Sequence, residues 1–558
     1  MSSRIVSLAG GTHQLLVNGR PFLMRAAEVN NSSFSSPAFM RAVWPKLVEN
    51  NVNTVLGAVS WDQIEPEEGR FDFNALDQVI RDARSHGLKL VLLWFGSFKN
   101  GLSTYVPPWV KKDTSRFPRA MSRQNETELL QLLDCLSVFH ENSYKADAKA
   151  FAALLCHLRQ VDEKENTIIM VQVENEVGLL RDSRDRCEAA EAAFQGKVPS
   201  HLIDVLQAQW STLNDILRGT LADFHIRETS SSWEQVFGHN SLQTDEIFMA
   251  YHYARYLEEV ASAGKAAYDI PLFTNTWLRN VPDKEDPASQ WPALLGGGTK
   301  PGEYPSGGPV ETVLDIWQLF APSLDFIAPD IYLSHYEKTC AGYRHRRQPL
   351  FIPEQRQDEP GALRMWAAIG SHGALGVSPF GIDNSSPDVS PFTAHYKLLA
   401  QVAPQILQAR ADGRAIHGFF FDRFDKGEED PSKPRVVQMG SWTLTISRAF
   451  VFGHPAPSYG MVIHQESDKF LLVGEGYQVS FKSTDPGARF SGILSVRELE
   501  ATGGPEPDLL EGRWLNGDES SQGKAVIMPS ESPDCGGFFI SSWIPARTRI
   551  AECSVYSI

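Results

Sequence analysis

The chain has 558 residues, a length that favours one large domain followed by a second. Its composition, 42% hydrophobic and 22% charged residues, is typical of a globular protein with a sizeable core. The formal net charge of −16 opposes binding to nucleic acid or to anionic membranes, so we expect neither as a partner.

The N-terminus lacks the long apolar segment of a signal peptide, and the chain contains no apolar run of 18 residues. These observations predict a cytoplasmic protein without a membrane span, with a secreted form left open. The 15 histidines include no HExxH motif and no paired ligand spacing, so we predict no metal and no other cofactor. The sequence leaves the oligomeric state open.

Short apolar runs recur in the first 400 or so residues, separated by segments of helical or loop character. They do not alternate apolar and polar residues, which is typical of strands buried on both faces. Amphipathic helices are predicted between them, at 35–51, 74–87 and 145–161. The runs cover residues 22–29, 54–61, 88–96, 168–176, 271–277, 326–332, 349–355 and 373–382. Buried strands alternating with helices predict an α/β fold, a (β/α)8 TIM barrel.

The pattern changes twice along the chain. An insertion around 180–265, between the fourth and fifth runs, has a helical pattern. After about residue 410, short β-like segments alternate with Gly, Pro, Asp and Ser. We therefore predict a catalytic barrel with a helical insertion over 1–410, followed by a β-sandwich domain over 411–558.

Acidic side chains stand at the ends of two predicted strands. The fourth run ends with Glu174, Asn175 and Glu176, and the seventh ends with Glu354. In a (β/α)8 barrel the strand ends form the active site, and two carboxyl groups facing each other there cleave glycosidic bonds. One holds a proton and the other stays ionised. A lone Glu after a strand is more often solvated, but the joint placement on strands four and seven favours Glu176 and Glu354 as a catalytic pair.

The segment VQVENEVG, at 171–178, resembles the acid/base motif of the retaining β-galactosidases of glycoside hydrolase family 35. The segment NTVLGAVSWDQIEPEEGRFDF, at 53–73, resembles the second-strand region of that family. The resemblance covers about 10–410. It implies that Glu176 is the acid/base, that Glu354 is the nucleophile and that Asn175 binds the sugar 2-hydroxyl.

The chain departs from the family pattern in three places. Ala58 stands where the family usually has a sugar-binding Tyr, and FGSFKNG, at 95–101, replaces the usual Ala-Glu-Trp. Gln355 and Arg356 follow Glu354 in place of an aromatic-rich segment. These departures indicate a divergent branch, whose similar members also carry a C-terminal β-domain, and they concern sugar specificity rather than the retaining mechanism.

The ends of the other runs supply further candidates for substrate binding, each with core packing or a solvated loop as its alternative. Glu28 and Asn30 are candidates for holding sugar hydroxyls, Tyr332 for contacting the nucleophile, and Trp277 for stacking on a sugar ring. The full set of these candidates is Glu28, Asn30, Trp61, Lys99, Asn100, Asn275, Trp277 and Tyr332.

The sequence thus predicts an exo-acting retaining glycoside hydrolase that releases terminal β-galactose from an oligosaccharide or other glycoside by double displacement. Two alternatives remain. One is a β-glycosidase of the same clan with a different sugar specificity, and the other is a catalytically silent carbohydrate-binding protein.

Overall fold

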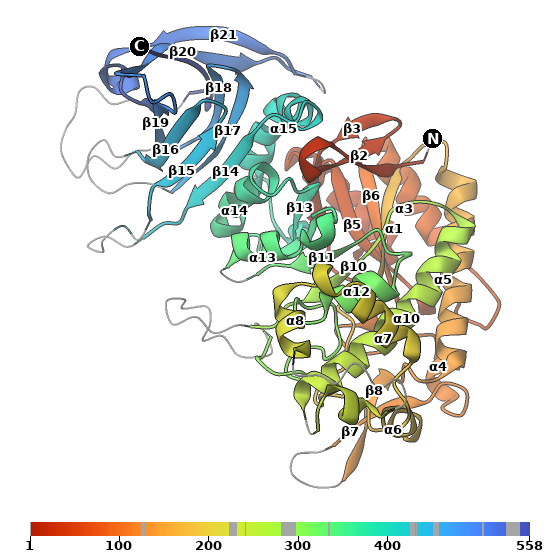
Figure 1. The fold of residues 1–558 in the computed structure, drawn as a ribbon. Coiled ribbons are helices and arrows are strands. Elements are labelled where there is room, and N and C mark those ends of the chain that lie inside the picture. The colour runs from red at the N-terminus through yellow and green to blue at the C-terminus, as the bar shows by residue number, and fades with distance from the viewer. Residues whose placement is uncertain are drawn as a thin grey trace.

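The computed structural model shows a barrel and, on one side of it, a unit built mainly of strands (Figure 1). It describes residues 2–123, 129–222, 231–239, 241–280, 297–332, 335–424, 430, 432–449, 457–504, 507–531 and 547–558.

Eight parallel strands form the barrel and follow one another around it in chain order. Seven neighbouring pairs form parallel ladders, and a parallel bridge between Ile331 and Gln355 joins the two remaining edges. The predicted (β/α)8 fold is therefore confirmed. The strands are β4 (Met24–Glu28), β5 (Thr54–Ser60), β6 (Lys89–Lys99), β9 (Ile168–Asn175), β10 (Leu272–Trp277), β11 (Phe326–Asp330), β12 (Ile352–Gln355) and β13 (Gly376–Pro379).

A small antiparallel sheet precedes the barrel and was not predicted from the sequence. It consists of β1 (Arg4–Ser7), β2 (His13–Val17) and β3 (Arg20–Phe22). Leu15 and Val17 of β2 belong to the hydrophobic cluster inside the barrel, together with Met24 and Phe273 from the starts of two barrel strands. The sheet thus covers the end of the barrel where the strands begin. The opposite end, where the strands finish, remains available for a functional site.

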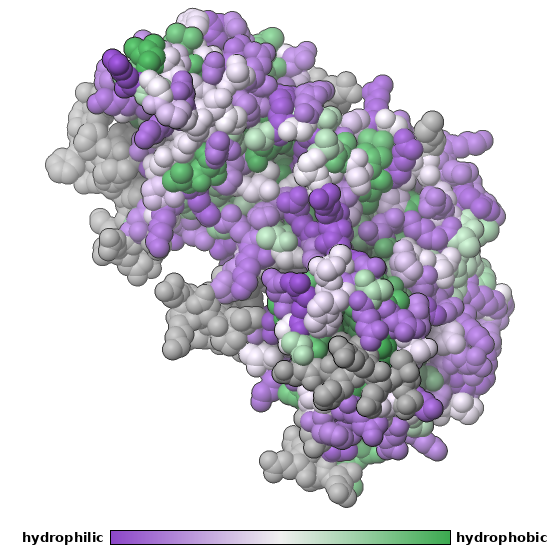
Figure 2. Space-filling view, in the orientation of Figure 1, coloured by the Kyte–Doolittle hydropathy of each residue, from purple (hydrophilic) through white to green (hydrophobic). Residues whose placement is uncertain are grey.

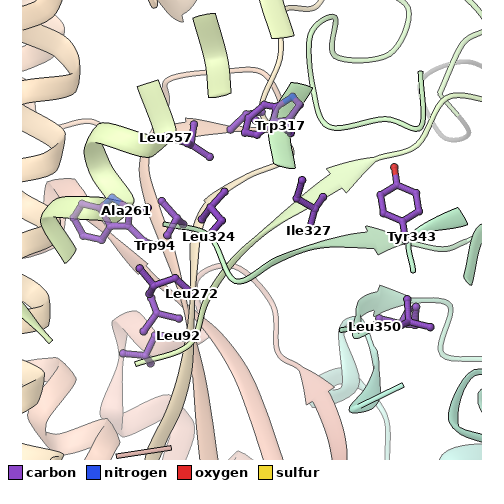
Figure 3. Packing of buried hydrophobic residues seen from close by; sticks show 14 of the residues in the cluster. Leu92, Trp94, Leu257, Ala261, Leu272, Trp317, Leu324, Ile327, Tyr343 and Leu350 are labelled. Carbon is purple, nitrogen blue, oxygen red and sulfur yellow. The ribbon is translucent and has the colours of Figure 1, made fainter. Parts of the chain in front are cut away.

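Helices surround the strands and bury a second, larger hydrophobic cluster (Figure 3). Leu92 of β6 and Leu272 of β10 face Leu257 and Ala261 of α10 (Leu242–Ala267) there. Burying one such leucine is worth about 1.5–3 kcal/mol. The other long helices on the barrel are α1 (Pro37–Glu49), α3 (Asn74–Ser85), α5 (Glu141–Asp162), α14 (Glu359–Gly370) and α15 (Pro391–Ala411).

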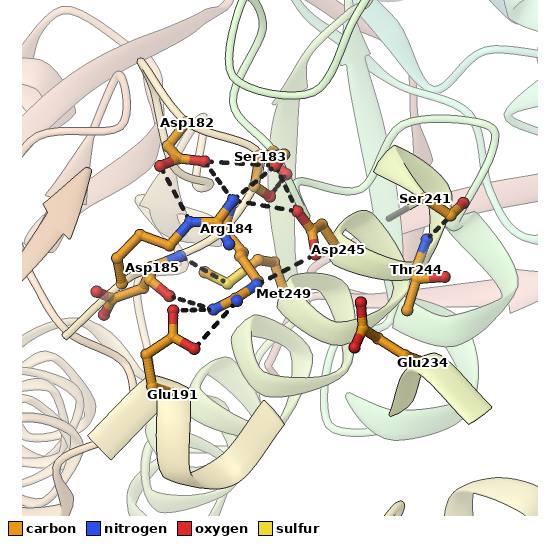
Figure 4. A network of polar contacts seen from close by, with 12 residues as sticks. Asp182, Ser183, Arg184, Asp185, Glu191, Glu234, Ser241, Thr244, Asp245 and Met249 are labelled. Carbon is orange, nitrogen blue, oxygen red and sulfur yellow. Dashed lines mark hydrogen bonds and ion pairs between the residues drawn. The ribbon is translucent and has the colours of Figure 1, made fainter. Parts of the chain in front are cut away.

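Most of the chain between β9 and β10 is helical where it is described. Its helices are α6 (Glu188–Gln195), α7 (Ser200–Ala208), α8 (Asp215–Leu221), α9 (Trp233–Phe237) and α10. A network of ion pairs fixes the loop after β9 to α10 (Figure 4). Asp245 of α10 accepts from Ser183 at 2.5 Å and pairs with Arg184 at 3.2 Å.

The C-terminal strands form two sheets with a hydrophobic cluster between them, which confirms the predicted sandwich. The order in the larger sheet is β14 (Ile416–Phe421), β17 (Ser458–Glu466), β18 (Lys469–Glu475), β23 (Ile550–Ser557), β20 (Ser491–Ala501) and β21 (Leu509–Leu515). The order in the smaller sheet is β15 (Arg435–Met439), β16 (Trp442–Arg448), β19 (Tyr477–Ser483) and β22 (Val526–Met528).

The larger sheet packs on both of its faces. Val462 of β17 points into the sandwich core, whereas its neighbours Met461 and Ile463 belong to the cluster that surrounds the barrel. A strand alternates its side chains between two faces. One face of this sheet therefore packs in the core of the sandwich, and the other packs against the barrel. We propose the division into 1–410 and 411–558, because α15 ends at Ala411 and the next strand already belongs to the sandwich.

Hydrophilic residues predominate on the face drawn in Figure 2, and hydrophobic residues gather there in separate small groups. Among the described residues, no helix combines the length and the apolar character needed to cross a membrane. Cys553 is a free thiol in the sandwich core, and Cys535 lies outside the described residues.

The contact between barrel and sandwich gives a stability prediction at Tyr459. Its ring lies 5.4 Å from that of Trp366 on α14 and 4.2 Å from that of His395 on α15. We expect Tyr459→Ala to lower the free energy of unfolding by about 3–5 kcal/mol, the usual effect of removing a buried aromatic ring. The matched control is Phe490→Ala, because Phe490 is 50% exposed and should contribute within about 0.5 kcal/mol. Equal denaturation midpoints for the two variants would contradict the prediction.

Candidate active site

Glu176 and Glu354 meet at the end of the barrel where the strands finish. Glu176 directly follows β9, and Glu354 lies in β12. One carboxylate oxygen from each of Glu176, Glu354 and Asp330 lies within 4.8 Å of the other two. All three residues are buried. The structure therefore brings together the two carboxyl groups that the sequence pairs, and it adds a third.

Three donors orient the carboxylate of Glu354. Its Oε1 accepts from Nδ2 of Asn175 at 3.4 Å and from Nδ2 of Asn275 at 3.5 Å. Its Oε2 accepts from the hydroxyl of Tyr332 at 2.9 Å. These contacts come from β9, β10 and the segment after β11, so three neighbouring strands fix the direction of one side chain.

Glu176 has the electrostatic environment of a proton donor. Burial raises the pKa of Glu176 to about 7, the carboxylate of Glu354 adds to the rise, and Lys99 opposes it. The backbone N–H of Glu176 donates to Oδ1 of Asn275 at 2.9 Å, which fixes the main chain at this point. Glu176 is thus poised to exchange a proton near neutral pH.

Lys99, at the end of β6, supplies positive charge to this group of acids. Its Nζ donates to Oδ1 of Asn175 at 2.9 Å. Burial alone would lower the pKa of Lys99, but the carboxyl groups of Glu354, Glu176, Glu28 and Asp330 outweigh it and raise that pKa. Lys99 therefore remains a cation, and its contact with Asn175 links it to Glu354.

Glu28 and Asn30, at the end of β4, lie beside the same cluster. Neither carboxylate oxygen of Glu28, which is 1% exposed, has a hydrogen-bond partner among the described residues. Burial raises the pKa of Glu28 well above its usual range, and Glu354 adds to the rise. Asn30 instead donates its side-chain amide to Oδ1 of Asp383 at 2.8 Å. Glu28 thus has free hydrogen-bonding capacity, whereas the amide of Asn30 is partly used.

The remaining candidates occupy different surroundings. Trp61 is fully buried in the cluster around the barrel, and its Nε1 donates to Oε2 of Glu65 at 2.8 Å, so the structure does not bring it to the cluster of acids. Asn100 follows Lys99 and donates its backbone N–H to the carbonyl of Asn175 at 3.2 Å. Trp277, the last residue of β10, is half-buried and pairs in register with Asp330.

Sequence reasoning missed two acids that build the site, Asp330 and Asp383, and assigned no role of its own to a third, Glu174. Asp330 ends β11 and accepts from Nδ2 of Asn275 at 2.7 Å. Asp383 accepts from Asn30, and also from the hydroxyl of Ser33 at 2.7 Å. Glu174 was noticed only as part of its motif. The available signal for Asp330 was its position as the only acid of its apolar run, the same signal that identified Glu354.

Glu174 fixes the backbone of β6 just before Lys99. It accepts from the backbone N–H of Ser97 at 3.0 Å and of Phe98 at 2.6 Å. Asp147 of α5 lies beside it and accepts from Nε1 of Trp94 at 2.9 Å. A Cβ on Gly96 would stand 2.5 Å from Glu174 and 2.7 Å from Asp147, so only glycine leaves room for both carboxyl groups. These contacts account for the glycine at 96, which lies within β6.

The three clustered carboxylate oxygens are close enough to share a metal ion. Both oxygens of Glu354, however, already accept from N–H or O–H donors, and an ammonium group supplies positive charge nearby. A metal ion would compete with these donors and with the positive charge of Lys99. The expectation of no catalytic metal therefore stays a prediction.

Two family models match separate parts of the chain. Residues 40–277 match a glycoside hydrolase family 42 model, described as beta-galactosidase. This part of the chain is therefore similar to glycoside hydrolases of the β-galactosidase type. It gives no support to the resemblance to family 35. Residues 392–527 match a model described as a domain of unknown function, DUF5597.

Several solved structures are similar to this one. The β-galactosidase from Rahnella sp. R3 is 16% identical with a TM-score of 0.44, and the match covers 72% of this chain and 58% of that one. The β-galactosidase from Bacillus circulans sp. alkalophilus is 16% identical with a TM-score of 0.44, over 69% and 57% of the two chains. The β-amylase catalytic domain from Paenibacillus polymyxa is 12% identical with a TM-score of 0.46, over 67% and 96%.

This chain therefore spans less than two thirds of the length of the Rahnella enzyme. No curated protein matches it.

The contacts of Glu174 give a prediction about the stability of the site. We expect Glu174→Ala to lower the free energy of unfolding by about 1–3 kcal/mol or more, because the backbone N–H of Phe98 loses its acceptor in a buried place. Urea denaturation measures the change. Glu163→Ala removes an exposed carboxylate and is the matched control. If both variants unfold at the same urea concentration, Glu174 does not hold β6.

Proposed function

We propose that the protein is an exo-acting retaining β-galactosidase, with Glu354 as nucleophile and Glu176 as acid/base. The observation that carries the proposal is the pair itself, with oxygens of the two carboxyl groups within 4.8 Å. Retaining glycosidases place these groups about 5–5.5 Å apart, whereas inverting enzymes separate them by about 6.5–9.5 Å to admit a water molecule. The short separation favours direct attack on the sugar.

The geometry suits two successive displacements at one carbon. In the first, an oxygen of Glu354 bonds to the anomeric carbon while Glu176 gives its proton to the departing glycosidic oxygen. In the second, Glu176 takes a proton from water, the water oxygen bonds to the anomeric carbon, and the bond to Glu354 breaks. The contacts of Asn175, Asn275 and Tyr332 hold Glu354 in line for both steps.

The surroundings of the pair suit a neutral terminal sugar. Both buried oxygens of Glu28 lack donors among the described residues, and the hydroxyl groups of a sugar would supply them. Lys99 offers further hydrogen bonds, and Asn175 lies close enough to Glu354 to reach the 2-hydroxyl. The half-buried Trp277 is our candidate for a stacking surface.

Two further features bear on the type of substrate. Glu176 and Glu354 are each only 6% exposed, which favours entry of a chain end over binding along an open groove. The match to the β-galactosidase model supports galactose, but it ends at residue 277 and so does not include Glu354. The sugar must therefore be tested directly.

The first test replaces the nucleophile. The wild-type protein should hydrolyse a nitrophenyl β-galactoside, and Glu354→Gln should lower kcat by roughly a thousandfold or more, because an amide oxygen is a poor nucleophile. Glu359→Gln changes an exposed carboxylate in the same part of the chain and should leave kcat unchanged. A folded Glu354→Gln variant with wild-type kcat would rule out the assignment. Nitrophenyl glycosides of other sugars test galactose specificity.

The second test concerns the acid/base. Loss of a general acid matters most for poor leaving groups, so Glu176→Ala should slow hydrolysis of an alkyl galactoside by about 10²–10⁴-fold and that of a dinitrophenyl galactoside much less. In the wild type, kcat/KM for the alkyl substrate should fall above about pH 7, because ionised Glu176 has no proton to give. We call this decrease the basic limb of the pH profile. The Glu176→Ala variant should lack it. Equal losses on both substrates would give Glu176 another role.

A further inference from the structure

Asp330 occupies the point where β11 meets the catalytic pair. Its Oδ2 accepts from Nδ2 of Asn275 at 2.7 Å. Its Oδ1 is buried and meets no N–H or O–H donor of the described residues. A carboxyl oxygen of Asp330 lies within 4.8 Å of one of Glu176 and one of Glu354. Two carboxyl groups form a hydrogen bond only if one of them carries a proton. A proton between Asp330 and Glu176 would relieve the repulsion of two buried carboxyl groups at this distance.

The charges around Asp330 favour the neutral form of this carboxyl group. The titratable groups that face it among the described residues are the carboxyl groups of Glu176, Glu354 and Glu28, the ammonium group of Lys99, and the hydroxyls of Tyr332 and Tyr343. One cation thus faces four buried acids. It balances one carboxylate, and Glu354 must be ionised in order to attack. Further ionised carboxyl groups would add uncompensated charge.

We propose that Asp330 is a protonated carboxylic acid throughout the reaction and that its O–H donates to Glu176. Asp330 is then a positioning residue, which acts through the acid/base and does not exchange its own proton with the substrate. The inference rests on the proposed function of Glu176 and Glu354. It identifies a buried acid as a neutral hydrogen-bond donor.

The consequence for the reaction follows from the charge on Glu176. When Glu176 gives its proton to the departing oxygen, it becomes a carboxylate among other acids. The O–H of Asp330 stabilises that carboxylate, while the bond from Asn275 keeps Asp330 turned toward it. When Glu176 later accepts a proton from water, the same hydrogen bond remains. Atoms and charges balance without any step at Asp330.

The titration behaviour agrees with this geometry. Burial raises the pKa of Asp330 well above its usual range, and Glu354 and Glu176 raise it further. The hydrogen bond from Asp330 lowers the pKa of Glu176, against the effects of burial and of Glu354 that bring it to about 7. A neutral Asp330 therefore makes Glu176 a stronger acid, whereas an ionised Asp330 would make it a weaker one.

Two substitutions separate these possibilities through the pH profile of kcat/KM on an alkyl β-galactoside. Asp330→Asn keeps an acceptor for Asn275 and a donor for Glu176, so the limb near pH 7 should stay in place and kcat should change by no more than about threefold. Asp330→Leu removes the donor, so the pKa of Glu176 should rise and the limb should move to higher pH by about 1–2 units. This shift corresponds to the free energy of one hydrogen bond to a charged group.

An ionised Asp330 predicts the opposite result. Both substitutions would then remove a negative charge beside Glu176 and move the limb to lower pH, and that result would overturn the proposal. If Asp330→Leu does not fold, Asp330→Asn alone decides, since an unchanged limb supports a neutral donor and a downward shift refutes it.

If the proposed function itself is wrong, the wild-type protein will hydrolyse no glycoside. This outcome differs from a shift of the limb, which concerns Asp330 alone. Infrared difference spectra between the wild type and Asp330→Asn at pH 7 test the protonation without turnover. The difference spectrum should contain one carboxylic-acid carbonyl band that the wild type has and the variant lacks. A difference spectrum without this band would overturn the proposal independently.

Discussion

The balance between one ammonium group and four buried carboxyl groups governs the arrangement of this site. Among the described residues, Lys99 is the cation that acts on Glu28, Glu176, Asp330 and Glu354. Four ionised acids in so small a volume would repel one another strongly, because the protein interior screens charge weakly. Protons and amide donors must therefore take the place of missing cations. The side chains of Asn175 and Asn275 do this at Glu354. The proton that we propose between Asp330 and Glu176 would do it for that pair.

The backbone around these acids is held in a costly conformation. Glu174 and Glu176 have φ angles of 60° and 46°, in the left-handed region that costs roughly 1–2 kcal/mol for a residue with a side chain. The two turns send Glu174 toward β6 and Glu176 toward Glu354, although the residues are separated only by Asn175. The contacts of Glu174 with Ser97 and Phe98 offset part of that strain. The two glutamates of the segment VENE, at 173–176, thus have different roles. Glu174 fixes β6, and Glu176 joins the cluster of acids.

The sequence predicted those features that depend on local pattern. Continuous apolar runs indicated strands buried on both faces, and acids at the ends of two runs indicated the pair that the structure brings together. The N-terminal sheet escaped prediction because its strands are short and its burial depends on a distant barrel end. Asp330 escaped, although it is the only acid of its apolar run, because its role arises from neighbours on other strands. Trp61 was undecided because a tryptophan after a strand suits a core and a pocket wall equally, and only its bond to Glu65 places it in the core.

The larger C-terminal sheet supports β12, the strand that carries Glu354, by packing against α14. Gln355 follows Glu354 and is held by the hydroxyl of Tyr336 at 2.6 Å and by the carbonyl of Gly361, near the start of α14, at 3.1 Å. The far end of α14 approaches β14 so closely that a Cβ on Gly370 would lie 2.6 Å from Gly418. The sandwich therefore fixes α14, and α14 fixes the segment that leaves β12. Packing at the domain contact thus reaches Glu354 through α14, which gives the C-terminal domain a structural role at the candidate site.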